Sequence, residues 1–222
     1  MNNLMLAEDL LLLLIKEKNG KIPLSLNKTL CYGIPGAILM DLKLMKKIVI
    51  EDSKIKVIDS EKTNCPLLDQ IVQIILENED QNSDFKYWIK ELSLSHKTLK
   101  KCLLASLEEK QFIRQYKKKF LWLFELKRYE ITNKHYREKL VKYLRKNIEN
   151  FDQMDRKAKI LLSILRGCQN IEDYCKELNL KDKDKLNGLL NEEVGKTINT
   201  IIAEYQERIY ASFIDSLYLP HS

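Results

Sequence analysis

Apolar residues recur along most of the chain with the spacing of a helix, separated by short polar breaks. A strongly apolar helix is predicted over residues 4–16, ended by the turn Lys18-Asn19-Gly20-Lys21. A second helix is predicted to run to about Lys46. Gly33 and Gly36 are unfavourable inside a helix, so we expect close packing there or a start near Pro35. Further helices are predicted from Pro66 to about residue 75 and over residues 85–92, 95–107, 134–150, 155–166 and 192–217.

Two short stretches alternate in the manner of β-strands. Residues 48–50 and 55–58 flank a polar loop and predict one hairpin. Residues 112–116 and 120–124 predict a second hairpin, with Lys117, Lys118 and Lys119 forming the loop at its tip. No Ser/Pro-rich linker or fixed-period repeat interrupts the pattern. The predicted fold is mainly α, a single helical domain over residues 1–222 with two small β-hairpins.

The helix that follows Ser95 places opposite residue types on its two faces. Ser95 is a favourable N-cap. Because residues three or four apart are neighbours on a helix, one face collects lysines that we expect to be exposed. The exposed face is formed by Lys97, Lys100 and Lys101, and the face predicted to be buried by Leu99, Cys102, Leu103 and Leu107.

Composition narrows the class of protein. The 222 residues are 45% hydrophobic and 32% charged, as in folded proteins. Only 6 Gly and 4 Pro argue against an all-β fold and a Gly-rich nucleotide loop. The five Cys form no CxxC pair, which favours reduced thiols, and the apolar run 10–15 has no basic leader. No apolar run is long enough to span a bilayer. We therefore expect a cytoplasmic protein.

Charge is distributed unevenly along the chain. Residues 86–146 contain 18 Lys and Arg against 6 Glu, a net charge of +12. The other residues contain 20 basic and 26 acidic side chains, a net of −6, which together give the overall +6. A basic middle between acidic flanks favours a polyanionic partner such as nucleic acid, a phospholipid surface or an acidic protein. The alternative is that the lysines merely solvate helix faces.

Motifs for catalysis or metal binding are missing from the sequence. The three His do not pair with Cys or carboxylates at a known spacing, and no phosphate loop, nucleophile elbow or HExxH occurs. Glu8 and Asp9 are adjacent on a helix, where side chains point about 100° apart and cannot share one proton or metal. We expect no enzyme activity, no metal site and no cofactor.

Residues 95–126 support three alternative functions. A helix pair followed by a basic hairpin suits a winged helix-turn-helix that touches nucleic-acid phosphates. The same lysines suit an anionic membrane surface, with Arg114 and the hairpin lysines 117–119 adding attraction. In the third alternative, Phe120, Trp122 and Phe124 form an apolar face on the hairpin 112–124. This face either packs into the core or binds a second copy of the chain or another protein.

Several motifs resemble the Golgi phosphoprotein 3-like family, in the family's order and over about residues 4–205. The first is Leu6-Ala7-Glu8-Asp9 followed by a leucine run and Lys18-Asn19-Gly20-Lys21. The second is Gly36-Ala37-Ile38-Leu39-Met40-Asp41-Leu42 before a short strand. Later come Pro66-Leu67-Leu68-Asp69, Trp88-Ile89, the helix leading to Ile113 and its hairpin, and Met154-Asp155-Arg156.

The resemblance implies a mostly helical peripheral membrane protein, at the Golgi if eukaryotic. Family members bind phosphatidylinositol 4-phosphate and the cytoplasmic tails of membrane proteins. Their lipid site uses two basic residues three apart, which match Lys97 and Lys100, with Lys101 beside them. It also uses a Trp and an Arg, whose positions read as Leu26 and Pro35 here, while Lys28 and Tyr32 lie close in sequence.

Overall fold

The computed structural model describes residues 4–78, 83–120, 124–174, 178 and 187–218, and within these it is mainly helical, as predicted. Among these residues are eight labelled α-helices: α1 (Leu6–Leu14), α2 (Ile34–Leu44), α3 (Pro66–Glu77), α4 (Phe85–Leu94), α5 (His96–Glu109), α6 (Lys134–Glu149), α7 (Arg156–Gly167) and α10 (Glu193–Tyr218). A π-helix (Thr29–Gly33) leads directly into α2, so the regular α-helix begins next to Pro35 as expected. Short 3-10 turns occupy Leu24–Leu26, Phe151–Gln153, Ile171–Tyr174 and Leu189–Asn191.

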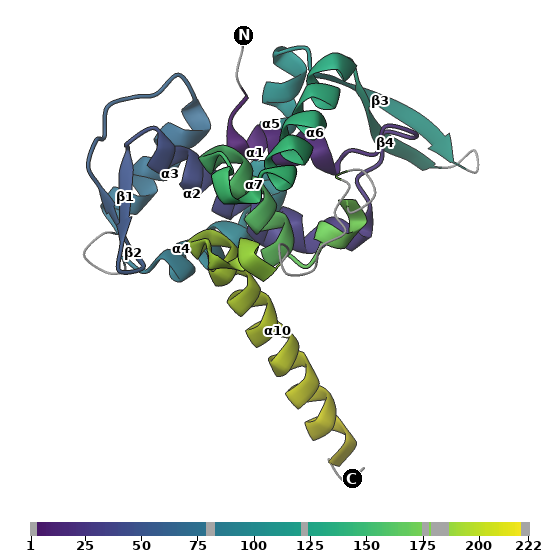
Figure 1. The fold of residues 1–222 in the computed structure, drawn as a ribbon. Coiled ribbons are helices and arrows are strands. Elements are labelled where there is room, and N and C mark those ends of the chain that lie inside the picture. Colours follow the sequence, from purple (N-terminus) through teal and green to yellow (C-terminus); the bar gives the residue numbers. More distant parts are fainter. Residues whose placement is uncertain (1–3, 79–82, 121–123, 175–177, 179–186, 219–222) are drawn as a thin grey trace.

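Both predicted hairpins are present as separate two-stranded antiparallel sheets. The first pairs β1 (Ile48–Glu51) with β2 (Lys54–Val57), with Ile50 opposite Ile55. The second pairs β3 (Ile113–Phe120) with β4 (Phe124–Ile131), with Ile113 opposite Ile131. The two hairpins lie at opposite ends of the helical body (Figure 1).

Helix α1 lies at the centre of the core and is buried on every side. All nine residues from Leu6 to Leu14 are buried, which explains why the apolar run has no polar face. Helices α2, α5, α6 and α7 pack around it. Because a helix surrounded by other helices has no solvent side, the acidic pair Glu8 and Asp9 is buried with it and requires partners.

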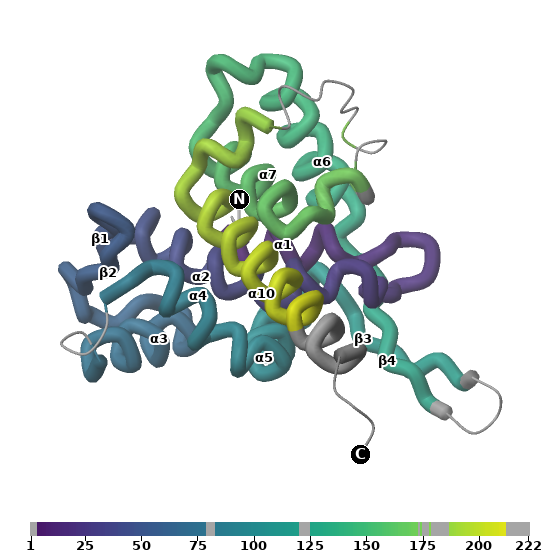
Figure 2. The backbone as a smooth tube through the Cα atoms, turned by 90° about the horizontal axis from the view of Figure 1, so that it is seen from below, coloured from purple at the N-terminus to yellow at the C-terminus, as the bar shows by residue number. Residues whose placement is uncertain are grey.

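Helix α10 begins on this body and then extends away from it (Figures 1 and 2). Its first turns pack on α7, where Gly167 and Gly195 meet. A Cβ at Gly195 would come within 2.6 Å of the Ser163 carbonyl oxygen, so only glycine permits this crossing. Val194, Ile198, Ile201 and Ile202 are buried, whereas Tyr205, Ile209 and Tyr210 are exposed.

Candidate functional site

The basic face of α5 is exposed, as the sequence predicted. Leu99, Leu103 and Leu107 are buried against the core, and this orientation leaves Lys97 and Lys101 exposed and Lys100 partly exposed. Ser95 occupies the N-cap position, although its side chain makes no capping hydrogen bond. Cys102 was predicted to be buried and is exposed instead, because Leu104 takes the fourth buried position on this helix.

The π-helix Thr29–Gly33 packs beside α5 and presents Cys31 and Tyr32 as partly buried side chains. Burial raises the pKa of the Cys31 thiol, and the nearby ammonium groups of Lys100 and Lys97 partly oppose that rise. The two lysines therefore lie close to this turn of the π-helix. A π-helical turn inside a helix is frequently found at functional sites.

Charged and polar side chains of α10 influence the pKa of Tyr32 on the same turn. Burial raises the pKa of Tyr32, and the guanidinium of Arg208 on α10 is near enough to lower it in part. Tyr205, also on α10, contributes to the rise. No sequence motif predicts this proximity, because the residues are distant along the chain.

Leu26 and Pro35, which the resemblance predicts at the positions of the family's Trp and Arg, do not reach the surface. Leu26 is 0% exposed and Pro35 is buried in the first turn of α2. Lys28 donates a hydrogen bond from Nζ to the Gln169 side-chain oxygen at 2.7 Å. Of the residues expected near this site, Tyr32 is partly buried next to Cys31, on the π-helix that packs against α5.

The second hairpin differs from its prediction in register and length. Lys117, Lys118 and Lys119 lie within β3, opposite Lys127, Leu126 and Glu125, and do not form the tip. The strands are longer than predicted because pairing continues to Ile131. Residues 121–123, between the two strands, lie outside the described residues. The side chains of Phe120, Trp122 and Phe124, predicted to share one face, are likewise outside the described part of the chain.

The charged residues of this hairpin do not form one uniformly basic surface. Because strand side chains alternate, Arg114 and Lys118 share one face while Lys117 and Lys119 share the other. The Arg114 guanidinium pairs with Glu130 at 2.5 Å, and Lys117 pairs with Glu125 at 2.6 Å. These ion pairs neutralise half of the four predicted cationic positions.

A turn near the N-terminus holds the hairpin in place. Gly20 has φ of +62°, and a Cβ there would lie 2.6 Å from the Tyr129 carbonyl oxygen. The Tyr129 N–H donates to the Gly20 carbonyl at 2.9 Å. Tyr116 adds a hydrogen bond from its hydroxyl to the Asn19 carbonyl at 3.3 Å. The Lys18–Lys21 turn therefore positions β3 and β4 relative to the helices.

The buried acidic pair of α1 is neutralised by structural partners. Glu8 accepts from the Lys110 ammonium at 2.5 Å and from the Ser106 hydroxyl at 2.7 Å. Asp9 lies 2.5 Å from the Lys157 ammonium and accepts from the Tyr136 hydroxyl at 3.0 Å. Each carboxylate binds its own lysine, so the pair connects α1 to the C-terminal end of α5 and to α7.

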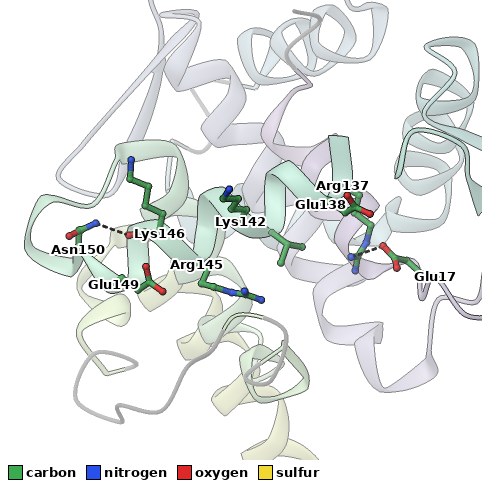
Figure 3. A pocket seen from close by; sticks show the side chains of 9 residues that line it. Glu17, Arg137, Glu138, Lys142, Arg145, Lys146, Glu149 and Asn150 are labelled. Carbon is green, nitrogen blue, oxygen red and sulfur yellow. Dashed lines mark hydrogen bonds and ion pairs between the residues drawn. The ribbon is translucent and has the colours of Figure 1, made fainter. Parts of the chain in front are cut away.

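A shallow hollow of about 720 Å³ along α6 is lined by charges of both signs (Figure 3). Arg137 donates to Glu17 at 2.9 Å across its edge. Its lining combines four basic side chains with three acidic ones, so it has little net charge: Arg137, Lys142, Arg145 and Lys146 against Glu17, Glu138 and Glu149. A hollow lined by this mixture of acidic and basic side chains is unsuited to a strongly anionic ligand.

Within the described ranges, no group of three or more His, Cys, Asp or Glu is arranged to hold a metal ion. The described helices also include none with the length and hydrophobicity required to cross a bilayer.

Comparison with known families matches residues 6–204 to the family model described as Golgi phosphoprotein 3 (GPP34). The match covers nearly the whole chain and confirms the resemblance found in the sequence motifs. The search of curated proteins finds no match.

Proposed function

Since this chain belongs to the Golgi phosphoprotein 3 (GPP34) family, we propose that it is a non-catalytic protein that binds anionic membrane surfaces through α5. Family membership supports a lipid-binding adaptor role. In this proposal the protein works at the cytoplasmic face of a membrane, at the Golgi if the source is eukaryotic. Cytoplasmic tails of membrane proteins are its second class of partner.

The observation that supports the proposal is that the lysines on α5 lack ion-pair partners among the described residues. Lys97, Lys100 and Lys101 make no ion pair with any residue in the described part of the chain. By contrast, Lys86 and Lys90 on α4 both pair with Glu204. Unpaired ammonium groups near an anionic membrane each contribute about 1 kcal/mol of attraction. Three on one helical face favour attachment to anionic lipid.

We propose phosphatidylinositol 4-phosphate as the preferred lipid, because Lys97 and Lys100 match the family's two basic positions. In this proposal the other two family contacts are missing, because Leu26 and Pro35 at the expected positions are apolar and buried. Ammonium groups bind phosphate as point charges, whereas a guanidinium can bind it with two hydrogen bonds. Selectivity for phosphatidylinositol 4-phosphate over other anionic lipids therefore depends on further groups near α5.

Liposome flotation tests the proposal. Neutral vesicles, vesicles with phosphatidylserine and charge-matched vesicles with phosphatidylinositol 4-phosphate are compared at moderate salt. The variant K97A/K100A is compared with K54A/K56A, which removes two exposed lysines from β2 at the other end of the body. We expect the first variant to lose anionic vesicle binding and the second to retain it.

Two results would contradict the proposal. If the wild type floats with none of the anionic vesicles, the protein does not bind anionic lipid and the proposal is wrong. Equal loss in both double variants would show that net charge matters and that α5 is not the binding face. A gel shift with duplex DNA at two salt concentrations then tests the nucleic-acid alternative, since binding through several phosphates weakens steeply with salt.

A further inference from the structure

A cavity of about 740 Å³ lies between α1, α6, α7 and the segment that leads into β3. Asp9 of α1, Leu140 of α6, Lys157 of α7 and Phe112 before β3 all line it. Helix α6 packs against both α1 and α7 at the end of the body that carries the second hairpin (Figure 1). Pockets of about 300–1,000 Å³ are typical of small-molecule sites, so the cavity has room for a ligand.

Aromatic and apolar side chains form one wall of this cavity. Tyr136, Leu140 and Tyr143 follow one another at spacings of four and three along α6, so they share one face of the helix. The Phe112 ring meets the Tyr136 ring edge to face, with centroids 4.8 Å apart. Three aromatic rings and a leucine around one cavity suit a flat apolar group such as another aromatic ring.

Hydrogen bonds hold the two tyrosine rings of this wall in place. The Tyr136 hydroxyl donates to Asp9 at 3.0 Å, and the Tyr143 hydroxyl donates to Asp155. Burial raises the pKa of both hydroxyls, so they remain protonated donors. Side chains that are ordered before a ligand arrives lose little further entropy on binding, which favours affinity.

The two acidic side chains of the lining are compensated within the protein. Asp9 lies 2.5 Å from the Lys157 ammonium, in addition to its bond from Tyr136. Asp155 accepts from the backbone N–H groups of Lys157 and Ala158 at 2.9 and 3.3 Å. These N–H groups belong to the first turn of α7, whose helix dipole favours a negative charge there. Neither carboxylate therefore needs a cationic ligand.

Lys139 differs from the other two lysines of the lining in its ion pairing. Lys110 and Lys157 each pair with a carboxylate of α1. Lys139 is exposed, lies between Tyr136 and Tyr143 on the same face of α6, and forms no ion pair in the part of the chain that the structure describes. One uncompensated ammonium beside an aromatic wall suits a ligand with a single negative charge.

We propose that this cavity binds a small aromatic carboxylate, with its ring against the aromatic wall and its carboxylate on the Lys139 ammonium. A carboxylate carries the one charge that this ammonium balances, and the pair forms a charge-assisted hydrogen bond. A phosphate monoester carries up to two negative charges and would place the second of them in a cavity that Asp155 also lines. The chemistry of the lining therefore favours the carboxylate.

The cavity is separate from the basic face of α5. Lys97, Lys100 and Lys101 do not line it. Lys110, which does, follows the last turn of the same helix, about 20 Å along the axis from Lys97. The inference therefore does not rest on the proposed membrane function, and a ligand in the cavity should leave vesicle flotation unchanged.

Titration of the full chain with indole-3-propionate, followed by NMR, tests the proposal. Indole-3-propanol has the same ring without the charge, and propionate has the charge without the ring. The methyl groups of two consecutive residues report the location, because Leu140 lines this cavity and Val141 lines the shallow hollow along α6. The variant K139Q is compared with K142Q, since Lys142 is also an exposed lysine of α6 but lines the shallow hollow.

We expect indole-3-propionate to shift the methyl signals of Leu140 and to leave those of Val141 nearly unchanged. It should bind about tenfold more tightly than indole-3-propanol, the value of one charge-assisted hydrogen bond, and propionate should bind more weakly still. K139Q should lower the affinity for indole-3-propionate about tenfold, to that of the alcohol, and K142Q should match wild type. Circular dichroism melting verifies that each variant is folded.

Each contrary result overturns a stated part of the inference. Shifts at Val141 without shifts at Leu140 would place the ligand in the shallow hollow. Equal affinity for the acid and the alcohol, or an unchanged affinity in K139Q, would remove the role of Lys139. Equal affinity for propionate and indole-3-propionate would remove the role of the aromatic wall. If none of the compounds shifts Leu140, the binding site itself is wrong, whatever the outcome of flotation.

Discussion

The Asp41 carboxylate of α2 accepts a hydrogen bond from the Leu6 backbone N–H at 2.7 Å. Its second oxygen accepts from the Ala7 N–H at 3.0 Å. Both donors belong to the first turn of α1, where backbone N–H groups have no partner within the helix. Asp41 therefore caps α1 from a different helix, and it joins the two sequence motifs that first indicated the family.

This cap predicts a specific dependence of stability on pH. Burial raises the pKa of Asp41 to about 7, although the two backbone hydrogen bonds partly oppose the shift. The folded state therefore binds more protons than the unfolded state between about pH 4 and pH 7. Over that window Asp41 makes the free energy of unfolding fall as pH rises, by at most about 1.4 kcal/mol per pH unit.

Urea unfolding of wild type and D41N at pH 5 and pH 7.5 checks this prediction. Asn cannot ionise, so the stability advantage of wild type over D41N should be larger at pH 5. An advantage that grows toward pH 7.5 would contradict the raised pKa.

Removal of the Lys157 ammonium should destabilise the protein. Lys157→Ala leaves the fully buried Asp9 carboxylate with only the Tyr136 hydroxyl and removes the hydrogen bond from Lys157 to the Leu4 carbonyl. Breaking a buried pair on one side costs about 3–5 kcal/mol, and the partial exposure of Lys157 lowers the expected loss to just below that range, about 2–3 kcal/mol. Chemical denaturation measures the change. Lys159→Ala is the control, because its pair with Glu192 is more exposed and should cost less than about 1 kcal/mol.

Substitution of Gly20 should loosen the second hairpin. Gly20→Ala places a Cβ against the Tyr129 backbone at a left-handed φ of +62°. The expected cost is about 1–3 kcal/mol, with faster hydrogen exchange at the Tyr129 amide. Gly188→Ala is the control, since Gly188 has an ordinary φ of −57° and its Cβ would meet only the Phe151 ring. Equal losses in the two variants would show that the left-handed turn is unimportant.

The hairpin lysines should differ in their contribution to vesicle binding. Lys117 is paired with Glu125, whereas Lys118 makes no ion pair among the described residues. We expect Lys118→Ala to weaken binding to phosphatidylserine vesicles more than Lys117→Ala does, by a factor of about 2–5 for one ammonium. Flotation over a lipid titration measures both. The reverse order would mean that the Glu125 pair opens at the membrane.

The cysteines should react with iodoacetamide at very different rates. Cys102 is exposed on α5, whereas Cys168 is buried and its pKa is raised to about 12 by burial. Mass spectrometry of the folded protein should find Cys102 modified first and Cys168 protected, because only an accessible thiolate reacts. Rapid modification of Cys168 would indicate that the contact between α7 and the π-helix opens readily.

The apolar periodicity of the sequence alone determined much of the secondary structure of this protein. It predicted the principal helices, both hairpins and the exposed lysine face of α5, because amphipathic spacing directly records which side of an element meets the core. The sequence also shows the acidic pair in α1, but its two separate lysine partners, Lys110 for Glu8 and Lys157 for Asp9, come from distant segments.

Other features required the tertiary structure. The position of the lysines 117–119 within β3 depends on pairing with β4, and a local pattern does not fix strand register. Cys102 is exposed because α5 is oriented so that Leu104 is buried. Packing of α5 against α1 and α2 sets that orientation. The π-helix Thr29–Gly33 packs against α4, α5 and α7, which are distant from it in the sequence. Sequence spacing reports neighbours along a helix, whereas contacts between distant segments are decided by how the helices pack.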